Sequence, residues 1–125
     1  MKIIKNDPPR TFEAGFDKKT AIKDCGTIEL SSDEQVTFIT GRGNEYDLVR
    51  KNWGFYATPS LNGRLLKFNL RAVLVKNRAN LFYVLLVEKG MEESFQNYAE
   101  TERLTLISWL DATAVLEKIE QCIRV

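Results

Sequence analysis

The chain has 125 residues, of which 44% are hydrophobic and 28% charged, and its formal net charge is +1. This composition is typical of a globular domain, so it excludes a disordered tail, a collagen-like fibre and a small disulfide-linked scaffold. The length predicts a single domain over residues 1–125. The chain has no histidine, which excludes Ser-His-Asp and Cys-His catalytic groups and histidine-based metal sites. The sequence therefore predicts no cofactor.

The two cysteines belong to no metal-binding or redox motif. Cys25 and Cys122 lie far apart in the sequence, and we expect two reduced thiols with at least one of them in the core, because free cysteine behaves as a small buried hydrophobe. No apolar run approaches the length of about 18 residues that a membrane helix needs. No long apolar segment follows the basic N-terminus, so we expect no secretory signal and a cytoplasmic location.

The first half of the chain predicts strands. Residues 1–10 are expected to form an extended arm, because residues 8 and 9 are both proline and proline biases its predecessor away from helix. Alternating residues predict short strands over 27–30 and 35–40, with turns over 31–34 and 41–44. Residues 45–57 predict one long strand with a bulge at Gly54. The dipeptide Asn62-Gly63 predicts a hairpin turn.

The second half moves from strands to helices. Residues 66–74 keep a period of two, and the apolar run 81–87 predicts a central strand buried on both faces. The spacing of Met91, Phe95 and Tyr98 predicts a helix after Gly90. A last strand is predicted over 104–110, and a final helix from an N-cap at Asp111 to about residue 123. The predicted fold class is α+β, a mostly antiparallel β-sheet of six to seven strands with two C-terminal helices packed on one side.

Charge is unevenly distributed along the chain. Residues 42–78 contain eight basic and two acidic side chains, whereas residues 79–125 contain four basic and eight acidic ones. A basic sheet region favours anionic ligands, because each cation that meets a phosphate or carboxylate gains a charge-assisted hydrogen bond. The alternative is that these side chains are ordinary solvated residues on the outer faces of antiparallel strands.

The stretch 45–64 is the strongest candidate for a binding site. It combines aromatic rings, paired acids, paired bases and side-chain amides, a mixture that suits a sugar ring, a nucleobase or a peptide. The alternative is that its aromatic residues belong to the core. The candidate ligand-binding residues are Asp47, Arg50, Lys51, Trp53, Tyr56, Asn62 and Arg64.

Two acids in this stretch raise the question of catalysis. Glu45 and Asp47 are two positions apart, so on a strand they face the same side. Paired carboxylates can do the acid/base work of a glycosidase. Two acids near a turn are commonplace, however, and the sequence assigns no catalytic residue.

Two runs, EYDLVRKNWGFYATPSLNGRL (residues 45–65) and LVEKG (residues 86–90), carry a family resemblance. They resemble small uncharacterised bacterial proteins associated with surface-polysaccharide and nonulosonic-sugar gene neighbourhoods. The resemblance implies a bacterial, sugar-related context, and it carries over no activity and no site residue.

The sequence as a whole favours a non-catalytic binding or accessory module in bacterial surface-glycan biosynthesis. Its expected partners are an anionic sugar, a sugar nucleotide or a partner enzyme. Two alternatives stay open: a small metal-independent enzyme acting on a sugar or nucleotide-sugar, and a nucleic-acid-binding domain. The acidic C-terminal part disfavours the second, because it would repel a long polyanion. An exposed edge strand would also allow a homodimer.

Overall fold

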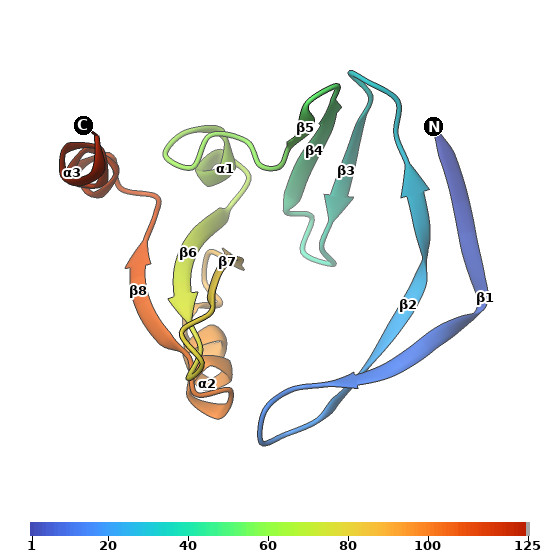
Figure 1. The fold of residues 1–125 in the computed structure, drawn as a ribbon, viewed down its shortest axis with the longest axis horizontal. Helices are drawn as coiled ribbons and strands as arrows, with labels where there is room; N and C mark the ends of the chain where they lie inside the picture. Colours follow the sequence, from blue (N-terminus) through green and yellow to red (C-terminus); the bar gives the residue numbers. More distant parts are fainter. Residues whose placement is uncertain (125) are drawn as a thin grey trace.

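The computed structural model describes residues 1–124, and within them the chain forms eight strands and three helices (Figure 1). All paired strands are antiparallel, so the α+β class and the antiparallel pairing are confirmed. No helix in this part of the chain combines the length and the apolar composition needed to cross a bilayer. The elements are β1 (Lys2–Ala14), β2 (Thr20–Glu29), β3 (Gln35–Ile39), β4 (Glu45–Lys51), β5 (Gly54–Tyr56), α1 (Arg64–Lys67), β6 (Leu70–Lys76), β7 (Phe82–Glu88), α2 (Glu92–Thr101), β8 (Thr105–Trp109) and α3 (Thr113–Ile123).

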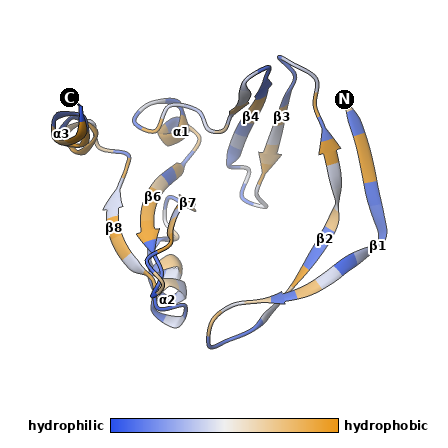
Figure 2. Ribbon diagram, viewed as in Figure 1, coloured by the Kyte–Doolittle hydropathy of each residue, from blue (hydrophilic) through white to orange (hydrophobic). Residues whose placement is uncertain are grey.

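The strands form three small sheets, where the sequence predicted one larger sheet. Their strand orders are β1-β2, β3-β4-β5 and β7-β6-β8. Most pairs join strands that are close in sequence, which keeps the entropy cost of loop closure low. Most residues of β1, β2 and β3 are exposed, so these strands have no buried face that would join them to the core. Figure 2 shows hydrophobic residues concentrated along β6 but interspersed with hydrophilic ones along β1 and β2.

The core is centred on β6, the middle strand of the β7-β6-β8 sheet. Ala72, Val73 and Val75 have no exposed surface. β7, by contrast, is an edge strand on which Phe82 and Val84 are more than half exposed. The prediction of a central strand over 81–87 is therefore wrong. Burial depends on partners, and β6 has a strand on each side whereas β7 pairs with β6 alone.

The two faces of this sheet carry separate hydrophobic clusters. On one face Leu70 packs with Leu65 of α1 and Leu116 of α3. On the other face Val73 packs with Phe95 of α2. Helices α2 and α3 therefore lie on opposite faces, and the prediction that both pack on one side is wrong. Successive residues of β6 point to opposite faces, and both faces are apolar, so each face needs its own cover.

The two longer helices lie close to their predicted positions. α2 begins after Gly90 and Met91, as expected, and α3 ends at residue 123. The N-cap of α3 is Ala112 and not Asp111. The Asp111 carboxylate accepts a hydrogen bond from Arg71 Nε at 2.5 Å.

Both cysteines are free thiols, and both are exposed. The prediction of at least one thiol in the core is therefore wrong. Cys122 lies on α3, which has an apolar side but no fully buried residue. Leu116 of this helix packs against the core cluster, whereas Ile123 at its end is 72% exposed.

Two turns between residues 45 and 70 differ from those predicted. β4 ends at Lys51 and β5 begins at Gly54, so a tight turn over residues 52–53 divides the predicted long strand in two. Gly54 has a φ of 151°, which glycine adopts far more readily than other residues and which allows the reversal here. Residues 62–63 lead into α1 and form no hairpin, because the Arg64 amide donates to Ser60 Oγ at 2.8 Å. The next strand therefore starts at residue 70 and not at 66.

β1 and β2 form a long hairpin, called the arm here (residues 2–29). The extended segment predicted over residues 1–10 is thus part of a paired strand. The register shifts between Lys5 and Arg10 on β1, where extra residues of β1 bulge out opposite β2. Figure 1 shows the arm beginning beside β3 and curving back toward the core sheet, so that its tip lies near α2.

Side chains around Glu88 join the β3–β4 turn to the core sheet. Asn44 donates to Glu88 Oε1 at 3.1 Å, and Arg42 Nε lies 4.0 Å from Glu88 Oε2. These contacts hold the pKa of Glu88 below its ordinary value. The main cause is a hydrogen bond from the Thr40 side chain; Asn44 and the charge of Arg42 add to it, and desolvation opposes them.

Acid is expected to weaken this junction. Because the pKa of Glu88 is lower in the folded chain than in the unfolded chain, its stabilising contribution is fully present above about pH 4.3 and is lost as the pH falls through the folded value. Glu88→Gln removes this contribution. In urea titrations the free energy of unfolding of the variant should therefore fall less than that of the wild type between about pH 5 and pH 3. Equal losses in the two proteins would contradict this role of Glu88.

Candidate functional site

Folding changes the charge distribution that the sequence suggests. Of the eight basic residues between 42 and 78, four form ion pairs with carboxylates, and most of those carboxylates lie outside this stretch. The basic middle of the chain is therefore not a continuous cationic surface. The pairs are Arg42–Glu88, Lys51–Asp33, Arg64–Asp47, Arg71–Glu92 and Arg71–Asp111.

Three of the seven candidate residues line one cavity. Asp47 of β4, Tyr56 of β5 and Arg64 of α1 border a space of about 270 Å³. Pairing of β4 with β5 places Tyr56 opposite Val49, which is two residues from Asp47 and so on the same face of β4. The sequence signal for these three residues was their polar and aromatic character in one short stretch. The remaining lining residues are Gln35, Val49, Pro59 and Ser60.

Asp47 is the most buried charged group of this cavity, with 7% of its surface exposed. Its Oδ1 accepts a hydrogen bond from Thr37 Oγ1 at 2.7 Å, and its Oδ2 accepts one from Arg64 Nη2 at 3.2 Å. A buried carboxylate is tolerated when it is paired and hydrogen-bonded in this way. A carboxylate can accept about four hydrogen bonds, so Asp47 retains capacity for donors of a ligand.

Arg64 is held in place from several directions. Its backbone amide bonds Ser60, and its guanidinium carbon lies 4.9 Å from the centroid of the Phe68 ring. Nearby, the Tyr46 hydroxyl donates to the carbonyl of Ala57 and so fixes the segment after β5. Burial raises the pKa of Tyr46, which keeps this phenol a neutral donor. The guanidinium side chain itself remains 61% exposed, open to a ligand in the cavity.

Three of the other candidate residues lie away from this cavity. Trp53 occupies the β4–β5 turn and is 70% exposed. Lys51 Nζ pairs with Asp33 at 2.5 Å. Asn62 donates to Thr113 Oγ1 at 3.1 Å and so ties the segment before α1 to α3. The turn over residues 52–53, which the sequence did not predict, separates Trp53 from Asp47.

Arg50 belongs to a different cavity. It projects from the opposite face of β4, where its Nη1 donates to the Gly54 carbonyl at 2.9 Å and its guanidinium lies 5.4 Å from the Phe55 ring centroid. Together with Ile4 and Ile28 of the arm, Arg50 and Phe55 border a space of about 380 Å³. This space is the junction between the base of the arm and β5.

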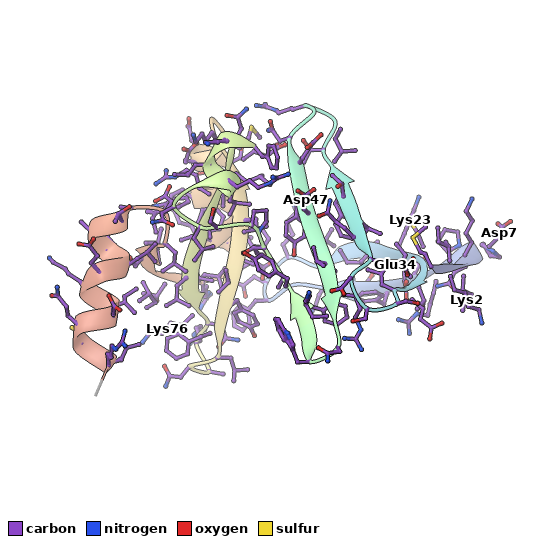
Figure 3. All side chains as sticks on the ribbon, turned by 90° about the horizontal axis from the view of Figure 1, so that it is seen from above. Lys2, Asp7, Lys23, Glu34, Asp47 and Lys76 are labelled. Atoms are coloured by element: carbon purple, nitrogen blue, oxygen red, sulfur yellow. The ribbon has the colours of Figure 1, made fainter. Side chains whose placement is uncertain are left out.

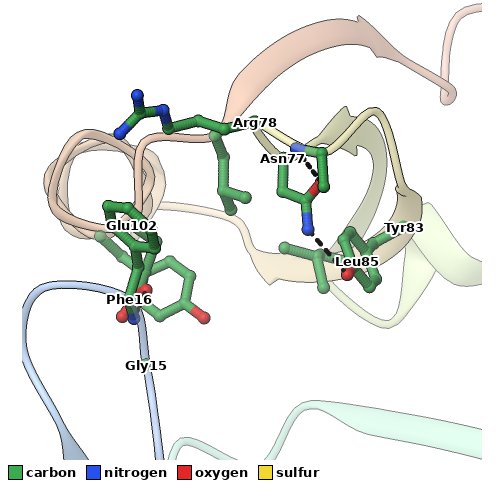
Figure 4. Close-up of a pocket in the computed structure, with 10 residues that line it drawn as sticks. Gly15, Phe16, Asn77, Arg78, Tyr83, Leu85 and Glu102 are labelled. Atoms are coloured by element: carbon green, nitrogen blue, oxygen red, sulfur yellow. Dashed lines mark hydrogen bonds between the residues drawn. The ribbon is translucent and has the colours of Figure 1, made fainter.

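A larger cavity, of about 450 Å³, lies under the tip of the arm. Figure 4 shows Phe16 and Glu102 on one side of it and Tyr83 and Leu85 on the other. Its polar groups hold the tip: the Phe16 amide donates to Glu102 Oε2 at 2.6 Å. The guanidinium carbons of Arg78 and Arg103 lie 5.4 and 5.3 Å from the Phe16 ring centroid. No sequence pattern predicted this cavity, because three segments distant in the sequence build it.

No three cysteine, aspartate or glutamate side chains within residues 1–124 come close enough together to hold a metal ion. The chain matches no known family model, and comparisons with curated proteins and with solved structures also find no match.

Proposed function

We propose that the chain is a non-catalytic binding module that takes a sugar ring in the cavity of Asp47, Tyr56 and Arg64. One observation carries this proposal. A nearly buried carboxylate, an exposed guanidinium and a phenol border one small space together with a hydroxyl and an amide. A bacterial surface-glycan context is proposed only from the resemblance of residues 45–65 and 86–90.

The chemistry of the cavity suits a hydroxylated ligand. Asp47 accepts hydrogen bonds from hydroxyl groups, and Arg64 donates to ring or carboxylate oxygens. The exposed ring of Tyr56 offers a flat apolar surface beside these polar groups. Because Asp47 and Arg64 balance each other in charge, the site suits a sugar that is neutral or carries a single carboxylate.

The size of the cavity further limits the kinds of ligand that fit it. Pockets that enclose drug-sized ligands measure about 300–1,000 Å³, and this one measures about 270 Å³. A single sugar ring therefore fits better than a whole sugar nucleotide.

The two alternative functions have less support from the geometry. An enzyme using both carboxylates would need Glu45 beside Asp47 at the cavity, but Glu45 is not among the residues that line it. Nucleic-acid binding would need free cations along a surface, and four of the eight basic residues in the middle of the chain are engaged in ion pairs.

A thermal-shift screen tests the proposal, with D-glucose, D-glucuronic acid, N-acetylneuraminic acid and UDP-glucose as probes. A monosaccharide present at a hundred times its dissociation constant should add about 2.7 kcal/mol of stability, which raises the Tm by several degrees. Tyr56→Ala should abolish that rise, and Asp47→Asn should weaken it. Trp53→Ala, which removes an exposed ring that does not line the cavity, is the matched control and should keep the rise.

Each outcome of the screen either supports the proposed sugar site or contradicts it. If none of the probes raises the Tm, the proposed sugar site is wrong. A rise that Trp53→Ala loses and Tyr56→Ala keeps would move the site to the β4–β5 turn. NMR spectra of the sugar recorded in the same samples would reveal a reaction product and thereby favour the enzyme.

A further inference from the structure

The surface of the chain is larger than its mass requires. The chain exposes 9131 Å², whereas a compact monomer of this mass is expected to expose about 6,800 Å². The excess of about 2,300 Å² exceeds the roughly 800 Å² that each partner buries in an interface of standard size. Much of the arm contributes to this surface, since almost every residue of β1 and β2 is exposed.

One face of the arm is apolar along its length. Ile3 stands opposite Ile28, and Phe12 stands opposite Ile22. Residues directly opposite in a strand pair share a face. Ile22 and Ile28 share a face because their position numbers on β2 differ by an even number. These four side chains, called the arm stripe, are each at least 40% exposed.

Within residues 1–124, polar contacts hold the arm to the rest of the chain near its two ends. At the base, the amino group of Met1 pairs with Glu34 at 3.1 Å. At the tip, Phe16 bonds Glu102, as described above. A two-stranded hairpin standing alone is marginally stable in water, so the length between these contacts is the part of the arm that a partner would stabilise most. Figure 3 shows the labelled arm residue Asp7 at the opposite end of the molecule from Lys76.

We propose that a second copy of this chain covers the arm stripe, with the two arms packed face to face about a two-fold axis. In such an interface each copy presents the same patch, so an apolar stripe meets an apolar stripe. Residues 2–29 contain six basic and five acidic side chains, so two arms carry little net charge and do not repel each other. The exposed surface of the whole chain exceeds that of a compact monomer by more than each partner buries in an interface of standard size.

The oligomeric state tests this proposal. Sedimentation equilibrium of the wild-type chain should give twice the chain mass. The double variant Phe12→Ser, Ile22→Thr should give the monomer mass, or a dissociation constant raised at least tenfold. The control Ile39→Thr, Ile123→Thr removes two apolar side chains outside the arm that are more exposed than Phe12 and Ile22, and it should remain dimeric. A monomeric wild type would overturn the proposal and would indicate that a different protein covers the stripe. A double variant that dimerises as well as the control would also overturn it.

The two native cysteines provide a test that does not depend on weakening the arm. Cys25 lies on β2 of the arm and Cys122 on α3, and both are exposed. A spin label on Cys25 in a Cys122→Ser background should show a short distance between copies. A label on Cys122 in a Cys25→Ser background should show a longer distance or none. A short distance from Cys122 alone would place the interface on α3 and overturn the arm-to-arm dimer. Neither result depends on sugar binding, so this proposal and the proposed function can fail separately.

Discussion

Replacing Arg71 with methionine should lower the free energy of unfolding by about 2 kcal/mol. Arg71 lies on β6 and contacts β8, the loop that follows β8, and the start of α2. Its Nε donates to Asp111 at 2.5 Å, its Nη1 donates to Glu92 at 3.2 Å, and its guanidinium carbon lies 3.9 Å from the Trp109 ring centroid. The bond to Asp111 is the main reason that the pKa of Arg71 is raised, with Glu92 contributing and desolvation opposing.

The loss of stability in Arg71→Met has a specific physical origin. Methionine retains much of the packing of the arginine stem, but it leaves the Asp111 carboxylate, whose side chain is only 11% exposed, without its cation. A charge that is partly buried and unpaired is costly, and this cost exceeds the value of the ion pair itself. Cation–π contact with Trp109 is lost as well.

Urea denaturation measures the effect, and Arg42→Met is the control. Arg42 is also an arginine paired with a glutamate, but its side chain is 58% exposed and the pair is 4.0 Å apart. Exposed pairs of this kind contribute about 0–1 kcal/mol. Similar losses in the two variants would show that Arg71 acts as an ordinary surface charge and does not hold the core together.

Local sequence patterns predicted the elements whose conformation depends mainly on their own residues. The strand at 35–39 follows the alternation around Val36 and Phe38, and the helix at 92–101 follows the spacing of Met91 and Phe95. The strand at 105–109 and the helix at 113–123 also lie within the predicted ranges. In each case the pattern of apolar residues within the segment itself is enough to predict the element.

Burial and sheet assignment could not be predicted in the same way, because they depend on partners distant in the sequence. Val84 and Val73 are both valines in apolar strands, yet Val84 is 55% exposed and Val73 is fully buried. The difference is that β6 has a neighbour on each side and helices α1 and α2 against its faces. A run of apolar residues does not indicate how many strands and helices will pack against it in the folded protein.

In the candidate site, too, the local features could be predicted from the sequence and the features that depend on distant segments could not. Asp47, Tyr56 and Arg64 come together because the hairpin of β4 and β5 and the turn into α1 are local. The basic stretch, by contrast, is partly neutralised by Asp33 of the β2–β3 turn and by Glu88 of β7, which both lie outside it. Charge counted along a sequence therefore overestimates the charge that a folded surface presents.

Truncating Leu65 to alanine should cost about 3 kcal/mol of stability. Leu65 is fully buried at the centre of the cluster that includes Leu70 and Leu110, with Tyr46 of β4 and Leu116 of α3 packed against it. The deletion leaves a cavity between the β3-β4-β5 sheet, the core sheet and α3, and the surrounding elements can close it only in part. Leu66→Ala, at the partly exposed next position of the same short helix, is the control and should cost clearly less.

The same variant links the core to the candidate site. Leu65 follows Arg64 directly in α1, so loosening this helix should also displace the guanidinium that pairs with Asp47. Under conditions where Leu65→Ala remains folded, we expect its sugar-induced rise in Tm to be smaller than that of Leu66→Ala. If Leu65→Ala loses stability but keeps the full rise, the position of Arg64 does not depend on the packing of α1, and its contacts with Asp47 and Ser60 are sufficient to hold it.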